Sequence, residues 1–461
     1  MRIRLFGHYW HLGLLFLWLS ESVAAVASAW FAERLLGGPV DATETWWIHG
    51  LVLGSLIMIV MISMGLYSRR LRERFAGILL RITVSVATGA LAGSMILALL
   101  LDHRPSFAQI ALFSAFAWAL LIFVRAVASR LIDDDIFKRR VLVFGAGSNA
   151  ARVAQLRRRT DQRGFKVIGY VPARSEQRQV DPTRLLNAEG GLCDLCDSME
   201  VDEIVVAMDD RREQFPLKDL MECRLRGFEV TDLATFLERE TGKVYLDILI
   251  PSWMIFGDGF RRDKMRRYSE RAFDIAASFA LLVFASPLML LTMIAVKLEE
   301  GLRAPLFYGQ PRVGYGGSVF RVLKFRSMRV DAEKDGKARW ATANDDRVTR
   351  VGKFIRKTRI DEIPQLFNVL AGQMSFVGPR PERPEFVSKL AESIPYYLQR
   401  HAVKPGITGW AQLCFPYGAS EQDAVEKLQY DLYYVKNHGL LFDILILLQT
   451  VEVILLGKGA R

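Results

Sequence analysis

Two adjacent carboxylates, Asp361 and Glu362, stand inside the otherwise apolar stretch RIDEIPQLFNVL, which runs from Arg359 to Leu370. Pro364 predicts a helix start here, because a proline deeper in a helix would break its hydrogen-bond ladder. At a helix N-terminus, backbone N–H groups and the helix dipole favour ionised carboxylates and also help to bind a phosphate. By spacing alone such a pair is more often a helix cap than a catalytic pair.

Cations close to this pair would suit phosphoryl chemistry, in which Mg²⁺ binds oxygens while lysine and arginine hold phosphates. Lys324 and Arg326 alternate along the second strand of an expected hairpin, PLFYGQPRVGYGGSVFRVLKFRSMR, and therefore point to one face of it. An ordinary surface strand is the alternative interpretation. Arg356 precedes the acidic pair, and we expect Arg380, which stands between two prolines, to act as a rigid phosphate clamp.

A strongly basic segment directly precedes the acidic pair and contains Lys324, Arg326 and Arg356. Between Arg261 and Ile360 there are 22 lysines and arginines against 10 aspartates and glutamates, a local net charge of +12, whereas the whole chain carries +11. This charge predicts either phosphate-bearing substrates, anionic lipid headgroups or a merely solvated face. Nucleic acid is not expected, because the segment encloses an uncharged apolar run of 22 residues from Ile275 to Val296.

That apolar run is long enough to cross a bilayer as a straight helix. Both of its flanks are basic, however, so a spanning helix would leave one basic flank on the wrong side. Ser286 and Pro287 stand in its middle; proline kinks a helix, and serine can bond a carbonyl that the proline frees. We therefore expect a re-entrant helix at residues 272–297, with a proline-kinked spanning helix as the alternative.

Four long apolar runs in the first third of the chain predict a four-helix transmembrane bundle over residues 1–130. Arginines gather before the first run and in the second loop, so the positive-inside rule places both ends of the bundle in the cytoplasm. Glu21, the charge within the first run, is either a functional residue in the membrane or a polar contact between helices. The four runs are Trp10–Phe31, Trp46–Tyr67, Ile82–Leu101 and Phe107–Val124.

Residues 140–250 predict a Rossmann-like α/β domain, because buried strands alternate there with helical stretches. Gly145 and Gly147 belong to a GxGxxA turn of the kind that holds a phosphate at a helix N-terminus. The second strand ends in VPAR, where an acidic residue would be needed to bind a ribose. We interpret the turn as a degenerate nucleotide loop in a structural or regulatory domain, with a working NAD site as the alternative.

Four scattered cysteines are too few for a disulfide framework, which is typical of proteins in a reducing compartment. Cys193 and Cys196 form a CxxC on an expected helix face, without a second ligand pair nearby. They therefore predict buried core residues and not a metal site.

The region from about Tyr268 to the C-terminus resembles the bacterial sugar transferase domain of the polyprenyl-phosphate phosphoglycosyl transferases. The resemblance rests on RAFDIAAS, the Ser286-Pro287 pair, QPRVGYGGSVFRVLKFRSM, RIDEIPQLFNVLAGQMSFVGPRPE, KPGITGWAQ and LQYDLYYVKN, in this order. The whole architecture looks like that of the large exopolysaccharide-initiating members, and PYGAS and LLGKGAR are similar to exosortase-associated ones. The resemblance implies a mixed α/β monotopic catalytic domain over residues 268–461, with the re-entrant helix of that family.

The resemblance also implies a reaction: transfer of a sugar 1-phosphate from a UDP-sugar to undecaprenyl phosphate, with Mg²⁺, as the first step of exopolysaccharide biosynthesis. Asp361 would attack the β-phosphorus and form a covalent phosphosugar intermediate, and Glu362 would assist through metal or proton handling. Both carboxylates would be metal ligands. The implied location is the inner membrane of a bacterium, with several helices in the lipid bilayer and the catalytic domain facing the cytoplasm. The expected substrate-binding residues are Lys324, Arg326, Arg356, Arg380 and Asp443.

One departure from the family pattern concerns donor specificity and activity. Relatives usually carry an arginine soon after GWAQ, whereas this chain has Leu413, Cys414 and Phe415. Two other functions are therefore considered: a membrane-anchored nucleotide-sugar dehydratase or epimerase, and a non-catalytic scaffold for polysaccharide assembly. The dehydratase needs a YxxxK pair, and every tyrosine of this chain lacks lysine at the fourth following position. Homodimers are common among similar large proteins, and neither a dimer contact nor the identity of the sugar is specified by the sequence.

Overall fold

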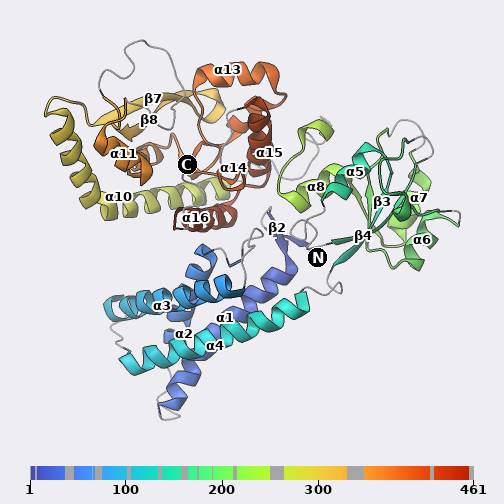
Figure 1. The fold of residues 1–461 in the computed structure, drawn as a ribbon, viewed down its shortest axis with the longest axis horizontal. Coiled ribbons are helices and arrows are strands. Elements are labelled where there is room, and N and C mark those ends of the chain that lie inside the picture. Colours follow the sequence, from blue (N-terminus) through green and yellow to red (C-terminus); the bar gives the residue numbers. More distant parts are fainter. Residues whose placement is uncertain are drawn as a thin grey trace. The chain divides into compact units, whose positions relative to one another are not determined.

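The computed structural model divides into two compact units, residues 1–249 and residues 250–461. The elements of both units are labelled in Figure 1. The structure describes residues 2–5, 8–36, 46–64, 66–67, 75–100, 105–132, 138–156, 165–173, 176–188, 190–210, 215–249, 264–329, 347–415 and 420–455.

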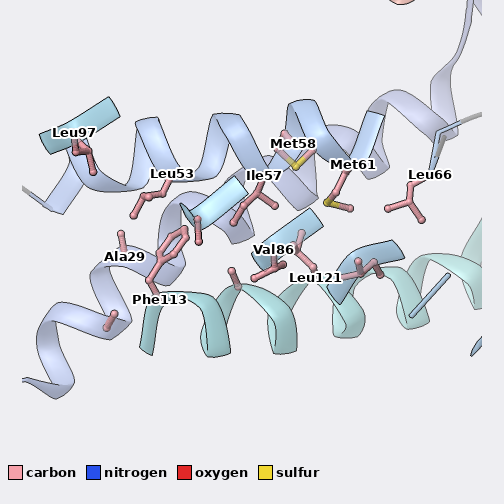
Figure 2. Packing of buried hydrophobic residues seen from close by; sticks show 14 residues of the cluster. Ala29, Leu53, Ile57, Met58, Met61, Leu66, Val86, Leu97, Phe113 and Leu121 are labelled. Carbon is pink, nitrogen blue, oxygen red and sulfur yellow. The ribbon is translucent and has the colours of Figure 1, made fainter. Parts of the chain in front are cut away.

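Four apolar helices of the first unit pack around one hydrophobic core (Figure 2). Ile57, Met61 and Leu121 are fully buried in this core. Helices α2 and α3 approach closely at Gly89, where an added Cβ would come within 2.7 Å of the Ile57 Cα. The helices are α1 (Leu12–Leu35), α2 (Trp46–Ser63), α3 (Phe75–Leu100) and α4 (Phe107–Ile132), preceded by the hairpin of β1 (Arg2–Leu5) and β2 (His8–His11).

Five helices in the described part of the chain are long and apolar enough to cross a membrane. They are these four and α10 (Lys264–Glu300) of the second unit. The chain is therefore a membrane protein, as the apolar runs predicted.

A buried ion pair joins three segments of the helix core. The guanidinium of Arg125 on α4 donates to both carboxylate oxygens of Glu21 on α1, over 2.8 and 2.9 Å, and to the carbonyl of Leu66, over 3.1 Å. The Tyr67 hydroxyl also donates to Glu21. The structure therefore gives Glu21 the role of a polar contact between helices, which was one of the two interpretations of this residue.

The rest of the first unit is an α/β domain whose four-stranded parallel sheet has the order β4-β3-β5-β6. Alternation along β3 explains its layers: Val141 and Val143 pack with α5 and α8 on one face, and Leu142 packs with α6 and α7 on the other. The strands are β3 (Arg139–Phe144), β4 (Phe165–Val171), β5 (Glu203–Val206) and β6 (Glu229–Asp232). The helices are α5 (Ser148–Gln155), η2 (Pro182–Arg184), α6 (Leu192–Ser198), α7 (Leu217–Leu225), α8 (Leu233–Thr241) and η3 (Leu246–Ile248).

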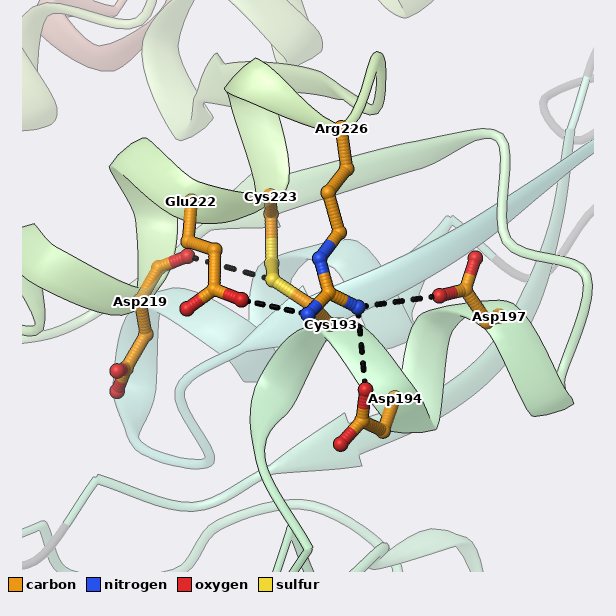
Figure 3. The surroundings of a disulfide bond; sticks show 7 residues. All are labelled: Cys193, Asp194, Asp197, Asp219, Glu222, Cys223 and Arg226. Atoms are coloured by element: carbon orange, nitrogen blue, oxygen red, sulfur yellow. Dashed lines mark hydrogen bonds and ion pairs between the residues drawn. A yellow bond between two sulfur atoms is a disulfide. The ribbon is translucent and has the colours of Figure 1, made fainter.

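The cysteines of this domain correct one expectation from the sequence. Cys193 on α6 and Cys223 on α7 form a disulfide, with their Cα atoms 5.2 Å apart, and Arg226 joins the same two helices through Asp194 and Glu222 (Figure 3). The sequence predicted no disulfide framework and named no pair, because these cysteines, 30 residues apart, meet only when α6 and α7 pack on one sheet face. The number of cysteines therefore gives no support for a reducing compartment.

Both cysteines of the CxxC are buried core residues, as predicted. Cys196 is a free, fully buried residue of the same core, and burial raises the pKa of its thiol to about 11. Throughout the described residues, no group of three or more His, Cys, Asp or Glu side chains could hold a metal ion.

In the second unit, the hairpin of β7 (Phe307–Val313) and β8 (Val319–Phe325) lies against helix α10 through Phe325 and Met289. The same core includes Ile355, Ile360 and Ile363, so the segment that carries the acidic pair is packed on α10 by apolar contacts. The other elements are η4 (Tyr315–Gly317), α11 (Arg350–Lys357), η5 (Ile360–Glu362), α12 (Gln365–Leu370), β9 (Ser375–Val377), α13 (Pro384–Ser393), η6 (Tyr397–Ala402), β10 (Gly406–Thr408), α14 (Trp410–Cys414), α15 (Glu421–Asn437) and α16 (Leu440–Leu455).

Helix α10 changes direction along its length (Figure 1). Pro287 lies inside this helix and cannot donate to the carbonyl of Val283, four residues earlier. The Ser286 hydroxyl donates to that same carbonyl over 2.8 Å. The serine thus satisfies the acceptor that the proline leaves open, which is the local arrangement that the sequence predicted.

The buried Glu21–Arg125 pair generates a stability prediction. Changing Glu21→Gln leaves the Arg125 charge buried without its counter-ion, so we expect a loss of about 3–5 kcal/mol of stability. Thermal unfolding in detergent measures it, with Glu33→Gln, a change on the same helix that leaves the pair intact, as the control. The double variant Glu21→Met/Arg125→Met should regain most of the loss, and a Glu21→Gln protein as stable as wild type would contradict the role of the pair.

Candidate active site

The acidic pair lies on a single helical turn between α11 and α12. Arg359 adopts a left-handed backbone conformation, φ 60°, and reverses the chain at the end of α11. Asp361 and Glu362 follow in η5, and α12 begins at Gln365, directly after Pro364. The predictions of a helix start at Pro364 and of acids just before it are confirmed.

Glu362 is bound by three cations from three different segments. Its Oε1 lies 2.9 Å from the Lys324 ammonium on β8, and 3.5 Å from the guanidinium groups of both Arg359 and Arg380. Burial raises the pKa of Glu362, but Lys324, Arg380 and Arg359 outweigh burial and hold this pKa at about 2. Glu362 is therefore ionised at every physiological pH.

Asp361 is buried, yet it lacks comparable partners. In the part of the chain that the structure describes, no side chain or backbone N–H group donates a hydrogen bond to its carboxylate. Burial raises the pKa of Asp361 above its usual range, and the Glu362 charge adds to this, while Lys324, Arg356 and Arg359 lower it. A carboxylate with a raised pKa is more basic, and when ionised a better nucleophile, than one with a lowered pKa, so the two carboxylates differ in chemical character.

Two arginines, the buried Arg400 and the half-buried Arg312, hold the loop that presents Arg380. The Arg400 guanidinium donates to the carbonyl of Arg380 over 3.0 Å and pairs with Asp431 at 2.7 Å. The Arg312 guanidinium donates to the next carbonyl, that of Pro381, over 3.0 Å. Arg380 itself donates to Gln412 on α14, over 3.3 Å, as well as to Glu362. The backbone of Arg380 and that of the next residue are thus each held by a hydrogen bond from another arginine.

The other two predicted phosphate-binding cations lie differently. Arg326 comes directly after the last residue of β8, donates to the carbonyl of Pro305 over 3.1 Å and stacks over the Tyr308 ring. Arg356 acts on Asp361 through its charge. Lys324 and Arg326 have different hydrogen-bond partners, but the pairing with β7 continues through Arg326, whose N–H donates to the carbonyl of Leu306 over 2.9 Å. The ring next to Arg326 is that of Tyr308, the residue opposite Lys324, which agrees with the predicted common face of the two cations.

Asp443, at the start of α16, belongs to another cluster of charges. It is buried, and the Tyr434 hydroxyl donates to it over 2.8 Å. Burial raises the pKa of Asp443 to about 8, and its charged neighbours are Glu270, Arg266 and Asp274. The groups that act on Asp361 and Glu362 are all different ones, so a contact of Asp443 with substrate stays a prediction.

In the α/β domain, backbone N–H groups of the glycine turn donate hydrogen bonds to two acidic side chains of the same chain. The N–H of Ala146 donates to Glu176, and the N–H groups of Ser148 and Asn149 donate to the two oxygens of Asp209, over 2.7 to 2.8 Å. A Cβ added to Gly147 would collide with the Asp209 carboxylate. A phosphate at Gly145 and Gly147 would have to displace both carboxylates, at the place where a dinucleotide would otherwise bind.

The acidic pair fits Mg²⁺ in the manner in which this ion usually binds. Mg²⁺ is commonly held by one or two carboxylates together with phosphate oxygens of the substrate, and not by a cage of protein ligands alone. Asp361 and Glu362 supply two such carboxylates. The cations on Glu362 engage its Oε1, so Asp361 and the second oxygen of Glu362 are the atoms that would hold the metal.

Several residues of this site carried no prediction from the sequence. Arg312, Arg400, Asp431 and Gln412 each stand within or beside a motif, but spacing along the chain gave them no partner. A polar residue within an apolar stretch, such as Asp431 in LQYDLYY, was the available signal, since a buried charge requires a counter-charge. Cys414 ends α14, two residues after Gln412, and residues 416–419 lie outside the described part of the chain.

Comparisons with known proteins identify the family to which the chain belongs. Residues 265–457 match the family described as bacterial sugar transferase. The chain is 43% identical over 242 residues to a UDP-N-acetylgalactosamine-undecaprenyl-phosphate N-acetylgalactosaminephosphotransferase of Aeromonas hydrophila, a match to 52% of this chain and 56% of that protein. It is 31% identical over 377 residues to an undecaprenyl-phosphate galactose phosphotransferase of Salmonella typhimurium, a match to 75% of this chain and 74% of that protein.

A third relative, an undecaprenyl-phosphate glucose phosphotransferase of Komagataeibacter xylinus, is 31% identical over 357 residues, 75% of this chain and 65% of that protein. The chain thus spans between about half and three quarters of the length of these relatives. The names of the three relatives differ in the sugar. The chain belongs to the bacterial sugar transferase family, and its predicted identity as an enzyme, a polyprenyl-phosphate phosphoglycosyl transferase, is confirmed.

Proposed function

We propose that this enzyme transfers a sugar 1-phosphate from a UDP-sugar to undecaprenyl phosphate, as the first step of exopolysaccharide biosynthesis. The observation that carries the proposal is the contrast between the two adjacent acids: three cations bind Glu362, whereas Asp361 is buried and receives no hydrogen bond from any described residue. A pair built only to cap a helix would place its carboxylates on the backbone N–H groups of that helix, and neither acid does so. The names of the relatives supply the acceptor and the class of donor.

The two acids would divide the reaction between them. In the first step a carboxylate oxygen of Asp361 attacks the β-phosphorus of the UDP-sugar, and the bond from this phosphorus to the bridging oxygen breaks, so that UMP leaves with the electron pair. In the second step a phosphate oxygen of undecaprenyl phosphate attacks the same phosphorus and releases the Asp361 carboxylate. Lys324 and Arg380, both fixed on Glu362, would hold the diphosphate oxygens in line.

Mg²⁺, when bound, would neutralise charge on the phosphates. The Asp361 and Glu362 carboxylates would hold it, and Glu362 remains ionised for this purpose because its pKa lies far below neutrality. The remaining charge of the substrate phosphates would fall on Lys324, Arg380 and Arg359, which already surround the pair.

The features of helix α10 support a site at the membrane surface, where a soluble donor can meet a lipid acceptor. We infer that α10 is re-entrant in the cytoplasmic face of the bacterial inner membrane, because its proline kink is locally satisfied and both flanks are basic. The apolar contacts of Ile360 and Ile363 with α10 would keep the acids next to that face. Among the apolar neighbours of the acids, Phe367 is 42% exposed and does not belong to this packing. Homodimer formation stays a prediction.

The two other functions have less support. A nucleotide-sugar dehydratase or epimerase would use the glycine turn for a dinucleotide, and Glu176 and Asp209 bind the donors of that turn. A non-catalytic scaffold rests on Cys414 alone, and it does not account for three cations gathered on one carboxylate.

The reaction is tested with membranes that contain the full chain and a panel of UDP-sugars. We expect release of UMP with at least one donor when Mg²⁺ and undecaprenyl phosphate are present, and loss of this release after chelation of the metal. Membranes that carry Asp361→Asn serve as the control for other enzymes. Absence of UMP release with every donor would favour the scaffold.

The nucleophile is tested by intact-protein mass spectrometry. Incubation with the donor alone should add the mass of one phosphosugar to the wild-type chain, and Asp361→Asn should abolish the adduct and lower turnover about a thousandfold or more. Asp423→Asn, which changes a capping aspartate of α15, is the matched control and should keep the adduct. An adduct that persists in Asp361→Asn would assign the nucleophile to another residue.

Re-entry of α10 is tested by labelling the two ends of this helix. Met265→Cys and Leu298→Cys place thiols at positions that are 78% and 82% exposed, in a chain whose Cys414 is changed to serine. If α10 returns to the cytoplasmic face, a membrane-impermeant maleimide should label both thiols in inverted vesicles and neither in intact cells. Labelling of Leu298→Cys from outside the cell would show instead that the helix spans the membrane.

A further inference from the structure

A buried amide, that of Asn368 on α12, is fully bonded to strand β8. Its Oδ1 accepts from the N–H of Leu323 over 2.9 Å, and its Nδ2 donates to the carbonyl of Arg321 over 2.8 Å. The second hydrogen of Nδ2 goes to the side chain of Gln373, over 2.8 Å. Only 3% of Asn368 is exposed. If the amide were rotated by 180°, its NH2 group would face the N–H of Leu323 and its oxygen would face the carbonyl of Arg321. The position therefore requires a side chain that has both an acceptor and a donor.

These bonds occupy the open edge of a two-stranded sheet. Hairpin β7–β8 has no third strand within the described residues, and Arg321 and Leu323 are two positions apart, so their backbone groups point to the same edge. The Asn368 amide therefore takes the place of a neighbouring strand over two residues.

The same amide joins the two segments that carry the Lys324–Glu362 pair. Lys324 follows Leu323 directly, and Glu362 lies one turn before the helix of Asn368. Apolar contacts of Phe325 with Ile360 and Ile363 also connect these segments, but such contacts are not directional and permit sliding along the strand. A paired donor and acceptor on the backbone fixes the position along the strand.

We propose that Asn368 is a positioning residue of this enzyme: it holds β8 against the acid turn so that the Lys324 ammonium stays on Glu362 and faces the donor phosphates. The inference rests on the proposed function, in which Lys324 binds those phosphates. Asn368 touches neither acid nor substrate and acts through Lys324. A displacement of about 1 Å at a reacting group costs on the order of a hundredfold in rate, so small movements of β8 have a large effect.

A double-mutant cycle on the full chain in membranes tests this role. Asn368→Ala and Lys324→Met should each lower UMP release by about ten- to a hundredfold, and the double variant should be no slower than Lys324→Met alone. Asn437→Ala, which removes another buried amide, is the control, and its effect should multiply with that of Lys324→Met. If the losses of activity caused by Asn368→Ala and Lys324→Met also multiply in the double variant, the proposal is overturned. Full activity of Lys324→Met would overturn the assigned role of Lys324 and, with it, the proposal.

A second measurement does not depend on activity. The acetylation rate of Lys324 by an amine-reactive ester, read by peptide mass spectrometry, should rise several-fold in Asn368→Ala because the ammonium leaves Glu362. Lys297, whose ammonium donates to the carbonyl of Ala304 over 2.7 Å, is the internal reference and should react as in wild type. Asn368→Asp, which keeps an acceptor for Leu323 and loses the donor to Arg321, should give an intermediate rate. An unchanged rate at Lys324, or an equal rise at Lys297, would overturn the proposal even if the chain released no UMP.

Discussion

The ion cluster on one oxygen of Glu362 is the interaction on which the arrangement of the site depends. Three cations, from β8, the turn after α11 and the loop after β9, converge on this atom. Together they lower the pKa of Glu362 to about 2, although burial raises it. The neighbouring Asp361 is buried and receives no hydrogen bond from the described residues, so cations act on it only through their charge. Two acids adjacent in sequence thus acquire different chemical properties from their surroundings alone.

Directional polar bonds maintain this cluster, while apolar packing only brings the segments together. Phe325, Ile355, Ile360 and Ile363 form a small core on α10 that would tolerate some sliding. The positions of these segments are fixed by side chains bonded to the backbone: Arg400 and Arg312 on the loop of Arg380, and Asn368 on β8. The kink of α10 follows the same principle, because Ser286 satisfies the carbonyl that Pro287 cannot reach. Each of these groups is costly to leave unbonded, which makes the observed geometry the favoured one.

The α/β domain shows why a fold does not by itself assign a function. It has a parallel sheet, helices on both faces and a glycine turn at the first strand, which are features of dinucleotide-binding domains. Asp209 and Glu176 nevertheless provide the negative charges that a phosphate would bring to this turn. Gly147 is required for the close approach of Asp209, so the glycine is explained by packing within the domain.

The sequence by itself determined the elements and their local chemistry. The apolar runs, the alternation along β3, the helix start at Pro364 and the relief of the Pro287 kink by Ser286 all follow from the fixed periods of helix and strand and from the missing N–H of proline. Only the tertiary structure decided which charged and sulfur-bearing groups meet. Lys324 contacts Glu362, 38 residues away, while Arg326 turns to Pro305 just beyond the end of the strand. Cys193 pairs with Cys223 and not with its CxxC neighbour. The reason is that backbone geometry fixes spacing within an element, whereas contacts between elements depend on how distant segments pack around a common core.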